Sequence, residues 1–156
     1  MNTTGILNKL YFSKRQKQLD KYTTQAKEIQ LKVFRHLIRQ GKKTQWGDEH
    51  HYDQIDSYEQ FRKNVHVNTY EELKDYIHKM REGGDSILWP GVVRWYAKSS
   101  GTTNDKSKFI PVSSNGLKNI HYKGGTDCVV SYLNVNPKSK FFSGKGLILG
   151  GSHAPN

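Results

Sequence analysis

The sequence predicts a mixed α+β fold of the α/β class, with a helical first half followed by strand–loop–strand–helix–strand. Two observations carry this prediction. Apolar residues recur at three- and four-residue steps as far as Gly84, which is the period of amphipathic helices. After Pro90, short runs rich in β-branched and aromatic residues alternate with polar, glycine-containing stretches, as strands and turns do. We therefore expect residues 1–88 to be mainly helical and residues 89–156 to be α/β.

A stripe of apolar residues predicts one long amphipathic helix near the start of the chain. Gly41 fits the end of this helix, since glycine is favoured just past a helix C-terminus. Lys42 and Lys43 suit the negative end of the helix dipole. The stripe consists of Leu19, Tyr22, Ala26, Ile29, Val33 and Leu37.

Capping-box signatures predict two shorter helices. Ser57 is followed three residues later by Gln60, and Thr69 by Glu72. In such a box the two side chains satisfy backbone N–H groups at the helix start. Gly83-Gly84 would end the second helix. This helical half contains no acid–base or metal-ligating constellation, so we expect no metal site in it.

Two strands are expected in the second half, over residues 92–97 and 109–112, joined by a polar loop. Pro111 indicates an edge or an irregular end, because proline cannot donate a ladder hydrogen bond. Residues 141–142 and 146–150 are further apolar runs, which we interpret as buried strand. A buried parallel strand normally leads into covering chain, so we expect the chain to be the N-terminal part of a larger domain.

Another helix is predicted between these strands. Ser113 or Ser114 can cap it, with Asn115 near its start. Gly124-Gly125 interrupts its apolar positions, and we expect a break or kink there. Cys128 lies in an apolar run, which favours a buried thiol over a nucleophile.

The composition limits the kinds of ligand and partner that the protein is expected to have. The formal net charge of +11 favours anionic ligands. The lysines and arginines are interleaved along helices rather than grouped in one block, which argues against a nucleic-acid-binding tail. One cysteine excludes an internal disulfide. The sequence contains no stretch approaching the ~18 apolar residues of a membrane span, and we expect a cytoplasmic protein.

The polar loop between the two strands has the chemistry to hold phosphates. Its hydroxyls and backbone N–H groups can surround an anion, a glycine allows close approach, and a lysine follows at the next strand. Composition alone also fits a polar hairpin turn without a ligand. It is not a G-x-x-x-x-G-K-[ST] loop, and no histidine is identified as a base for its hydroxyls. The candidate residues are Ser99, Ser100, Gly101, Thr102, Thr103 and Lys108.

This loop and its flanks resemble the acyl-acid amido synthetases, the auxin-responsive promoter proteins of the adenylate-forming superfamily. Their first ATP motif runs Ser-Ser-Gly-Thr, with a lysine at the tenth position, which Lys108 occupies counted from Ser99. Asp105 departs from that motif, in which glycine is frequent at this position. Further matching segments are Thr44-Gln45-Trp46-Gly47, Thr69-Tyr70-Glu71-Glu72-Leu73 and Leu149-Gly150-Gly151-Ser152-His153.

The resemblance implies an ATP- and Mg²⁺-dependent ligase that adenylates a carboxylic acid and joins it to an amino acid. Lys108 would neutralise charge on the phosphates. Ser152 and His153 follow the last expected strand, and because strand ends are frequent ligand positions in α/β folds, they are candidates for contact with the acyl substrate; a frayed terminus without a ligand is the alternative. The family's later ATP motifs are not in this sequence, so we expect the chain to be inactive alone. Two alternatives stay open: an acyl-CoA ligase of the same superfamily, and a non-catalytic basic module that binds nucleic acid or a partner protein.

Overall fold

The computed structural model describes residues 3–99, 107–145 and 147. It confirms the mixed fold, because helices occupy the first half and two strands and a long helix follow. The elements are α1 (Thr3–Thr24), α2 (Ala26–Gly41), α3 (Gln45–Glu49), the 3₁₀ turn η1 (Tyr52–Gln54), α4 (Tyr58–Asn64), α5 (Tyr70–Arg81), β1 (Trp95–Lys98), β2 (Phe109–Val112), α6 (Ser114–Gly116), the π-helical turn η2 (Leu117–Tyr122) and α7 (Lys123–Val135).

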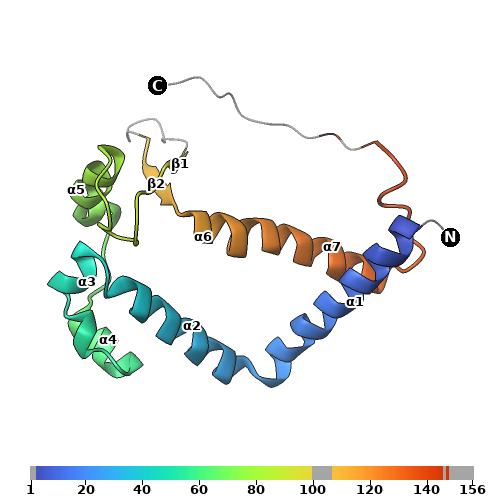
Figure 1. Cartoon of the computed structure of the whole chain (residues 1–156), viewed down its shortest axis with the longest axis horizontal. Helices are drawn as coiled ribbons and strands as arrows, with labels where there is room; N and C mark the ends of the chain where they lie inside the picture. The colour runs from blue at the N-terminus through green and yellow to red at the C-terminus, as the bar shows by residue number, and fades with distance from the viewer. Residues whose placement is uncertain (1–2, 100–106, 146, 148–156) are drawn as a thin grey trace.

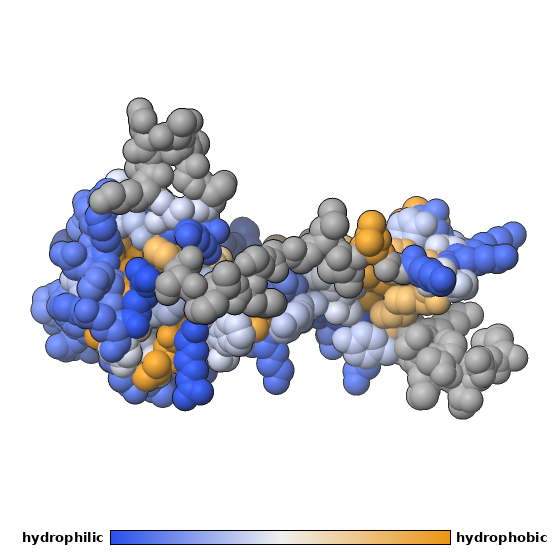
Figure 2. Space-filling view, turned by 90° about the horizontal axis from the view of Figure 1, so that it is seen from above, coloured by the Kyte–Doolittle hydropathy of each residue, from blue (hydrophilic) through white to orange (hydrophobic). Residues whose placement is uncertain are grey.

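The elements form an open frame (Figure 1). Helices α3, α4 and α5 gather with the two strands at one end, and α1 crosses α7 at the other. Apolar side chains accordingly appear in separate patches at the two ends (Figure 2). No helix among the described residues is long and apolar enough to span a membrane. The buried apolar side chains of the described part are Ile38, Ile55, Ile77, Met80, Val93 and Val130.

The prediction of one helix through residues 19–37 is wrong. The helix breaks at Gln25, whose φ of −124° and ψ of 26° are not helical. Just before the break, the Thr23 hydroxyl donates to the Asp20 carbonyl, a local bond that competes with helix continuation. The predicted stripe is also displaced, since Val33 is 51% exposed while Ile38 is buried. The predicted end of this helical region at Gly41 is confirmed.

Both predicted capping boxes are confirmed. The Ser57 hydroxyl accepts from the Gln60 N–H at the start of α4, and the Thr69 hydroxyl accepts from the Glu72 N–H at the start of α5. In each box the side chain at the third helical position accepts from the backbone N–H of the cap. Helix α5 ends before Gly83, whose φ of +94° is readily adopted by glycine.

A tight junction joins α2 to α3. The Thr44 hydroxyl donates to the Gly41 carbonyl over 2.7 Å and accepts from the Gly47 N–H over 3.0 Å. Gly47 is buried against this turn, and a Cβ atom at Gly47 would lie 2.0 Å from the Gly41 oxygen. Trp46 N–H donates to the Ile87 carbonyl. Glycine at position 47 is therefore required by close backbone approach.

Strands β1 and β2 form an antiparallel two-stranded sheet. Trp95 pairs with Val112, and Lys98 with Phe109. The second strand was predicted with its observed bounds, whereas the first begins later than expected, because Val92 forms only an isolated bridge with Asp85. In a two-stranded sheet each strand has one edge outside the ladder, which suits proline in β2.

One long helical segment follows the sheet. The Ser113 hydroxyl caps α6 by accepting from the Gly116 N–H, as predicted. The predicted break at Gly124-Gly125 is wrong, because α7 runs through both glycines. Figure 1 shows α6 and α7 as parts of one continuous helix. The irregularity instead precedes the glycines, as the π-helical turn η2. Glycine costs a helix about 1 kcal/mol relative to alanine, which does not by itself end it.

Two side-chain groups in α7 and beyond it were predicted to be buried, and both predictions are wrong. Cys128 is exposed, whereas α7 contacts α1 through the neighbouring Asp127 and buries Val130. Phe141 and Phe142 lie in a turn and are 55% and 61% exposed; their rings contact each other, and Phe142 stacks on Phe12 of α1. The strand expected over 146–150 falls, apart from Leu147, outside the described residues.

Candidate functional site at the β1–β2 hairpin

The predicted phosphate loop connects β1 to β2, which pair as an antiparallel hairpin. Of its candidate residues, Ser99 directly follows β1 and Lys108 directly precedes β2. Both side chains are partly buried. The remaining candidates lie outside the described residues: Ser100, Gly101, Thr102, Thr103, Asp105, Ser152 and His153.

The two ends of the loop are joined by reciprocal hydrogen bonds. The Ser99 N–H donates to the Lys108 carbonyl over 2.9 Å. The Lys108 N–H donates to the Ser99 hydroxyl oxygen over 3.1 Å. This hydroxyl acts as an acceptor here, and a hydroxyl has one O–H to donate as well. The structure therefore brings the first and tenth residues of the predicted motif together.

Helix α5 supports the base of the hairpin. The Phe109 N–H donates to the Tyr70 hydroxyl over 3.1 Å. The Lys108 ammonium lies 5.4 Å from the centroid of the Tyr70 ring, within the range of a cation–π contact. These two contacts connect the first residue of α5 to the lysine and to the strand that follows it.

Three cationic side chains surround this base. The Arg81 guanidinium lies 3.8 Å from the centroid of the Phe109 ring, and the Lys98 ammonium lies 6.0 Å from the same centroid. Together with Lys108 they make the base of the loop positive. Such a concentration of one charge attracts anions.

The carboxylates at the start of α5 are engaged elsewhere. Glu71 pairs with Lys74 at 3.4 Å. Glu72 serves the helix cap, and its hydrogen bond from the Thr69 backbone N–H lowers the pKa of Glu72. Nearby, burial raises the pKa of Tyr96, whose hydroxyl donates to the Val93 carbonyl.

The arrangement can hold an oxyanion. It offers the Ser99 hydroxyl and the Lys108 side chain at the loop base, whereas the N–H groups of Ser99, Lys108 and Phe109 already donate within the protein. Neither of these two hydrogen bonds of Ser99 involves a histidine, so they supply no base that would activate the hydroxyl as a nucleophile. In the part of the chain that the structure describes, no three histidine, cysteine or acidic side chains gather as a metal site would require.

Sequence reasoning missed two residues at this base, Tyr70 and Arg81. They lie on the face of α5 that also carries the buried Ile77, at spacings of seven and four residues. That spacing is a helical signal. It shows that the three share a face, but it does not reveal that the face meets β2.

Comparison with known proteins places the chain in a family. A family model described as "GH3 family N-terminal domain" matches residues 15–154. The chain is 29% identical to the 4-substituted benzoates-glutamate ligase GH3.12 of Arabidopsis thaliana over 108 residues, which are 69% of this chain and 19% of that relative. It is 30% identical to the indole-3-acetic acid-amido synthetase GH3.15 of the same organism over 101 residues, which are 64% of this chain and 17% of that relative.

These matches cover only a small part of each relative. The chain spans less than a fifth of the length of either curated relative. No solved structure matches it significantly. The family model nevertheless covers most of the chain. The chain therefore belongs to the GH3 family, within which it matches the N-terminal domain.

Proposed function

We propose that this chain is the N-terminal part of an ATP-dependent ligase that adenylates a carboxylic acid and joins it to an amino acid. The names of the relatives support this reaction class, because one is a benzoate–glutamate ligase and another an indole-3-acetic acid-amido synthetase. A location in the cytoplasm belongs to the same proposal. So does the expectation that residues 1–156, as one portion of a larger adenylation domain, do not complete the reaction alone.

The hairpin loop would bind the phosphates of ATP. One observation carries this assignment: the reciprocal bonds between Ser99 and the Lys108 backbone bring the start of the loop next to the lysine. Gly101 would allow the backbone to approach the phosphates. The other loop hydroxyls, from Ser100, Thr102 and Thr103, would donate to phosphate oxygens.

Charge is the physical difficulty of the first step. A carboxylate oxygen attacks the α-phosphorus of ATP, a P–O bond forms, and the bond to pyrophosphate breaks. An amine then attacks the acyl carbonyl and AMP leaves. Lys108 and the loop N–H groups would reduce repulsion between the two anions and stabilise the departing pyrophosphate. Mg²⁺, where bound, would contribute further charge neutralisation through phosphate oxygens.

The acceptor distinguishes this proposal from an acyl-CoA ligase. Both relatives are named for amide-forming reactions, and one name specifies glutamate. We therefore favour an amino acid over a thiol as the acceptor.

Replacing Lys108 with alanine tests the assignment. The Lys108→Ala chain is expected to bind Mg·ATP about tenfold more weakly by calorimetry, because one charge-assisted contact to phosphate is lost. The matched control is Lys74→Ala, which removes an exposed lysine paired with Glu71 on α5, and its affinity should match that of the unmodified chain. Equal affinity in both variants, with equal thermal stability, would remove Lys108 from the phosphate site.

A further inference from the structure

A second concentration of positive charge lies away from the hairpin, where α1 crosses the long helix formed by η2 and α7 (Figure 1). The two elements enclose a groove of about 490 Å³. Four of its lining residues are lysine or arginine and none is acidic. The proposed ligase function does not use this groove.

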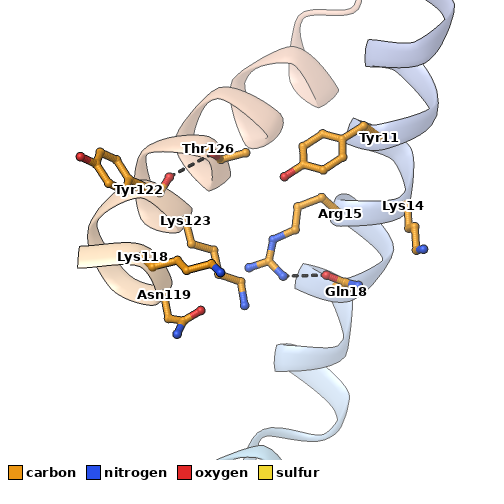
Figure 3. Close-up of a pocket in the computed structure, with 9 residues that line it drawn as sticks. All are labelled: Tyr11, Lys14, Arg15, Gln18, Lys118, Asn119, Tyr122, Lys123 and Thr126. Carbon is orange, nitrogen blue, oxygen red and sulfur yellow. Dashed lines mark hydrogen bonds between the residues drawn. The ribbon is translucent and has the colours of Figure 1, made fainter. Parts of the chain in front are cut away.

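The cationic side chains converge from both walls (Figure 3). Arg15 extends from α1 toward the opposite helix, and Lys118 and Lys123 extend from η2 and α7 toward Arg15. Lys14, although it lies on the groove wall, points away from the space between the helices. The hydroxyl end of Tyr11 also points across the groove.

One of these charges is already neutralised. The Arg15 Nε and Nη2 atoms donate to the two carboxylate oxygens of Asp127 over 2.6 and 2.8 Å, and Nη1 donates to Gln18 over 2.8 Å. Within the described residues, no carboxylate lies in salt-bridge range of Lys118 or Lys123. Asp127 also interacts electrostatically with Lys123, so one carboxylate is shared between Arg15 and Lys123. The groove therefore keeps a net positive charge, to which Lys118 and Lys123 both contribute.

The walls of the groove are held in place. The two-point contact between Arg15 and Asp127 joins α1 to α7 and fixes their separation at this point. Lys118 and Asn119 lie in the π-helical turn η2, and π-helical turns occur frequently at functional sites. Asn119 adds an amide donor to the lining.

From this geometry we infer that the groove binds a small phosphorylated anion through its phosphate group, which carries between one and two negative charges at neutral pH. The charge of such a group matches Lys118 and Lys123, and its oxygens match the donors of the lining. A groove walled by one sign of charge raises the local concentration of such an anion. Inorganic phosphate and a nucleoside monophosphate share this chemistry.

The test is a titration of the chain with inorganic phosphate at constant ionic strength, followed by amide chemical shifts. We expect saturable shifts at Lys118, Asn119 and Lys123, and at least tenfold weaker binding in the Lys118→Ala/Lys123→Ala variant. Lys14→Ala is the matched control, because this lysine lies on the same groove but points away, and its affinity should change less than twofold. A second titration with AMP distinguishes the sources, since tighter binding than phosphate would indicate that the nucleoside also contacts the groove.

Three results would overturn the inference. Equal weakening in the Lys14→Ala and Lys118→Ala/Lys123→Ala variants would show general attraction to a basic surface. Saturable shifts confined to the hairpin base, and lost in Lys108→Ala, would assign phosphate binding to that site alone. A short RNA that binds at least a hundredfold more tightly than phosphate, with shifts spread over the lysine-rich helices, would identify a nucleic-acid surface instead.

Discussion

Replacing Gly47 with alanine is expected to lower the free energy of unfolding by about 3 kcal/mol or more. The added Cβ atom would lie 2.0 Å from the Gly41 carbonyl oxygen and 2.6 Å from its carbon, and both are backbone atoms that cannot rotate away. The Thr44 hydroxyl bonds to both sides of this junction, so a shift to relieve the clash would break those bonds. Urea unfolding followed by circular dichroism measures the effect.

Gly125→Ala is the matched control for this glycine. It lies within α7, and a Cβ atom there would meet nothing within 4 Å. Alanine should therefore stabilise the chain by about 0.5–1 kcal/mol, because glycine loses more backbone entropy in a helix. A Gly47→Ala chain that unfolds at the same urea concentration as the unmodified protein would contradict the described junction.

Replacing Asp127 with alanine is expected to cost about 2–3 kcal/mol, because it leaves the Arg15 guanidinium mostly buried without its carboxylate. The Arg15 side chain is 9% exposed and that of Asp127 is 25% exposed. The contact links residues 112 positions apart, so its loss should release α1 from α7. A double-mutant cycle with Arg15→Ala isolates the coupling between the two side chains. The exposed Glu71–Lys74 pair serves as the comparison, with an expected coupling of about 0–1 kcal/mol.

The same pair gives the chain a defined response to acid. The hydrogen bond from Arg15 is the main cause that lowers the pKa of Asp127, and its bond to Asp127 is the main cause that raises the pKa of Arg15. Because the carboxyl pKa is lower in the folded state, the ionised carboxylate stabilises the fold at any pH above the unfolded-state pKa of about 3.9. This stabilisation is lost as the pH falls through the folded-state pKa. Asp127→Ala should therefore lose less stability than the unmodified chain below about pH 4. Parallel loss in both chains, or a coupling near zero, would show that the pair does not hold α1 to α7.

The features predicted well from the sequence are local. The boxes at Ser57 and Thr69 need only residues three positions apart, and both helices begin as expected. The strand over residues 109–112 is likewise recognisable from its own composition. Ser99 and Lys108 were assigned to one loop from its residue types and flanking strands as well as from family resemblance, and the hairpin places the two residues together; their role toward phosphate stays a prediction.

The features that the sequence did not predict depend on distant partners. Cys128 was expected to be buried because its neighbours are apolar, but burial requires a surface to pack against, and in the described structure α7 pairs with α1 through Asp127 while Cys128 is exposed. Tyr70 supports the hairpin through a hydrogen bond to a residue 39 positions away in the sequence. Arg15 and Asp127 are separated by 112 positions. No local pattern encodes such contacts. The break at Gln25 was missed because the apolar period continues through it.

The central claim is that the hairpin base at Ser99 and Lys108 holds the phosphates of ATP. It is tested most directly by titrating the isotope-labelled chain with Mg·ATP and following each backbone amide. We predict saturable shifts at Ser99, Lys108 and Phe109, which share the base with the Tyr70 hydroxyl, and their loss in Lys108→Ala. Saturation with Mg·ATP that leaves these amides unchanged, while amides elsewhere in the chain shift, would contradict the claim.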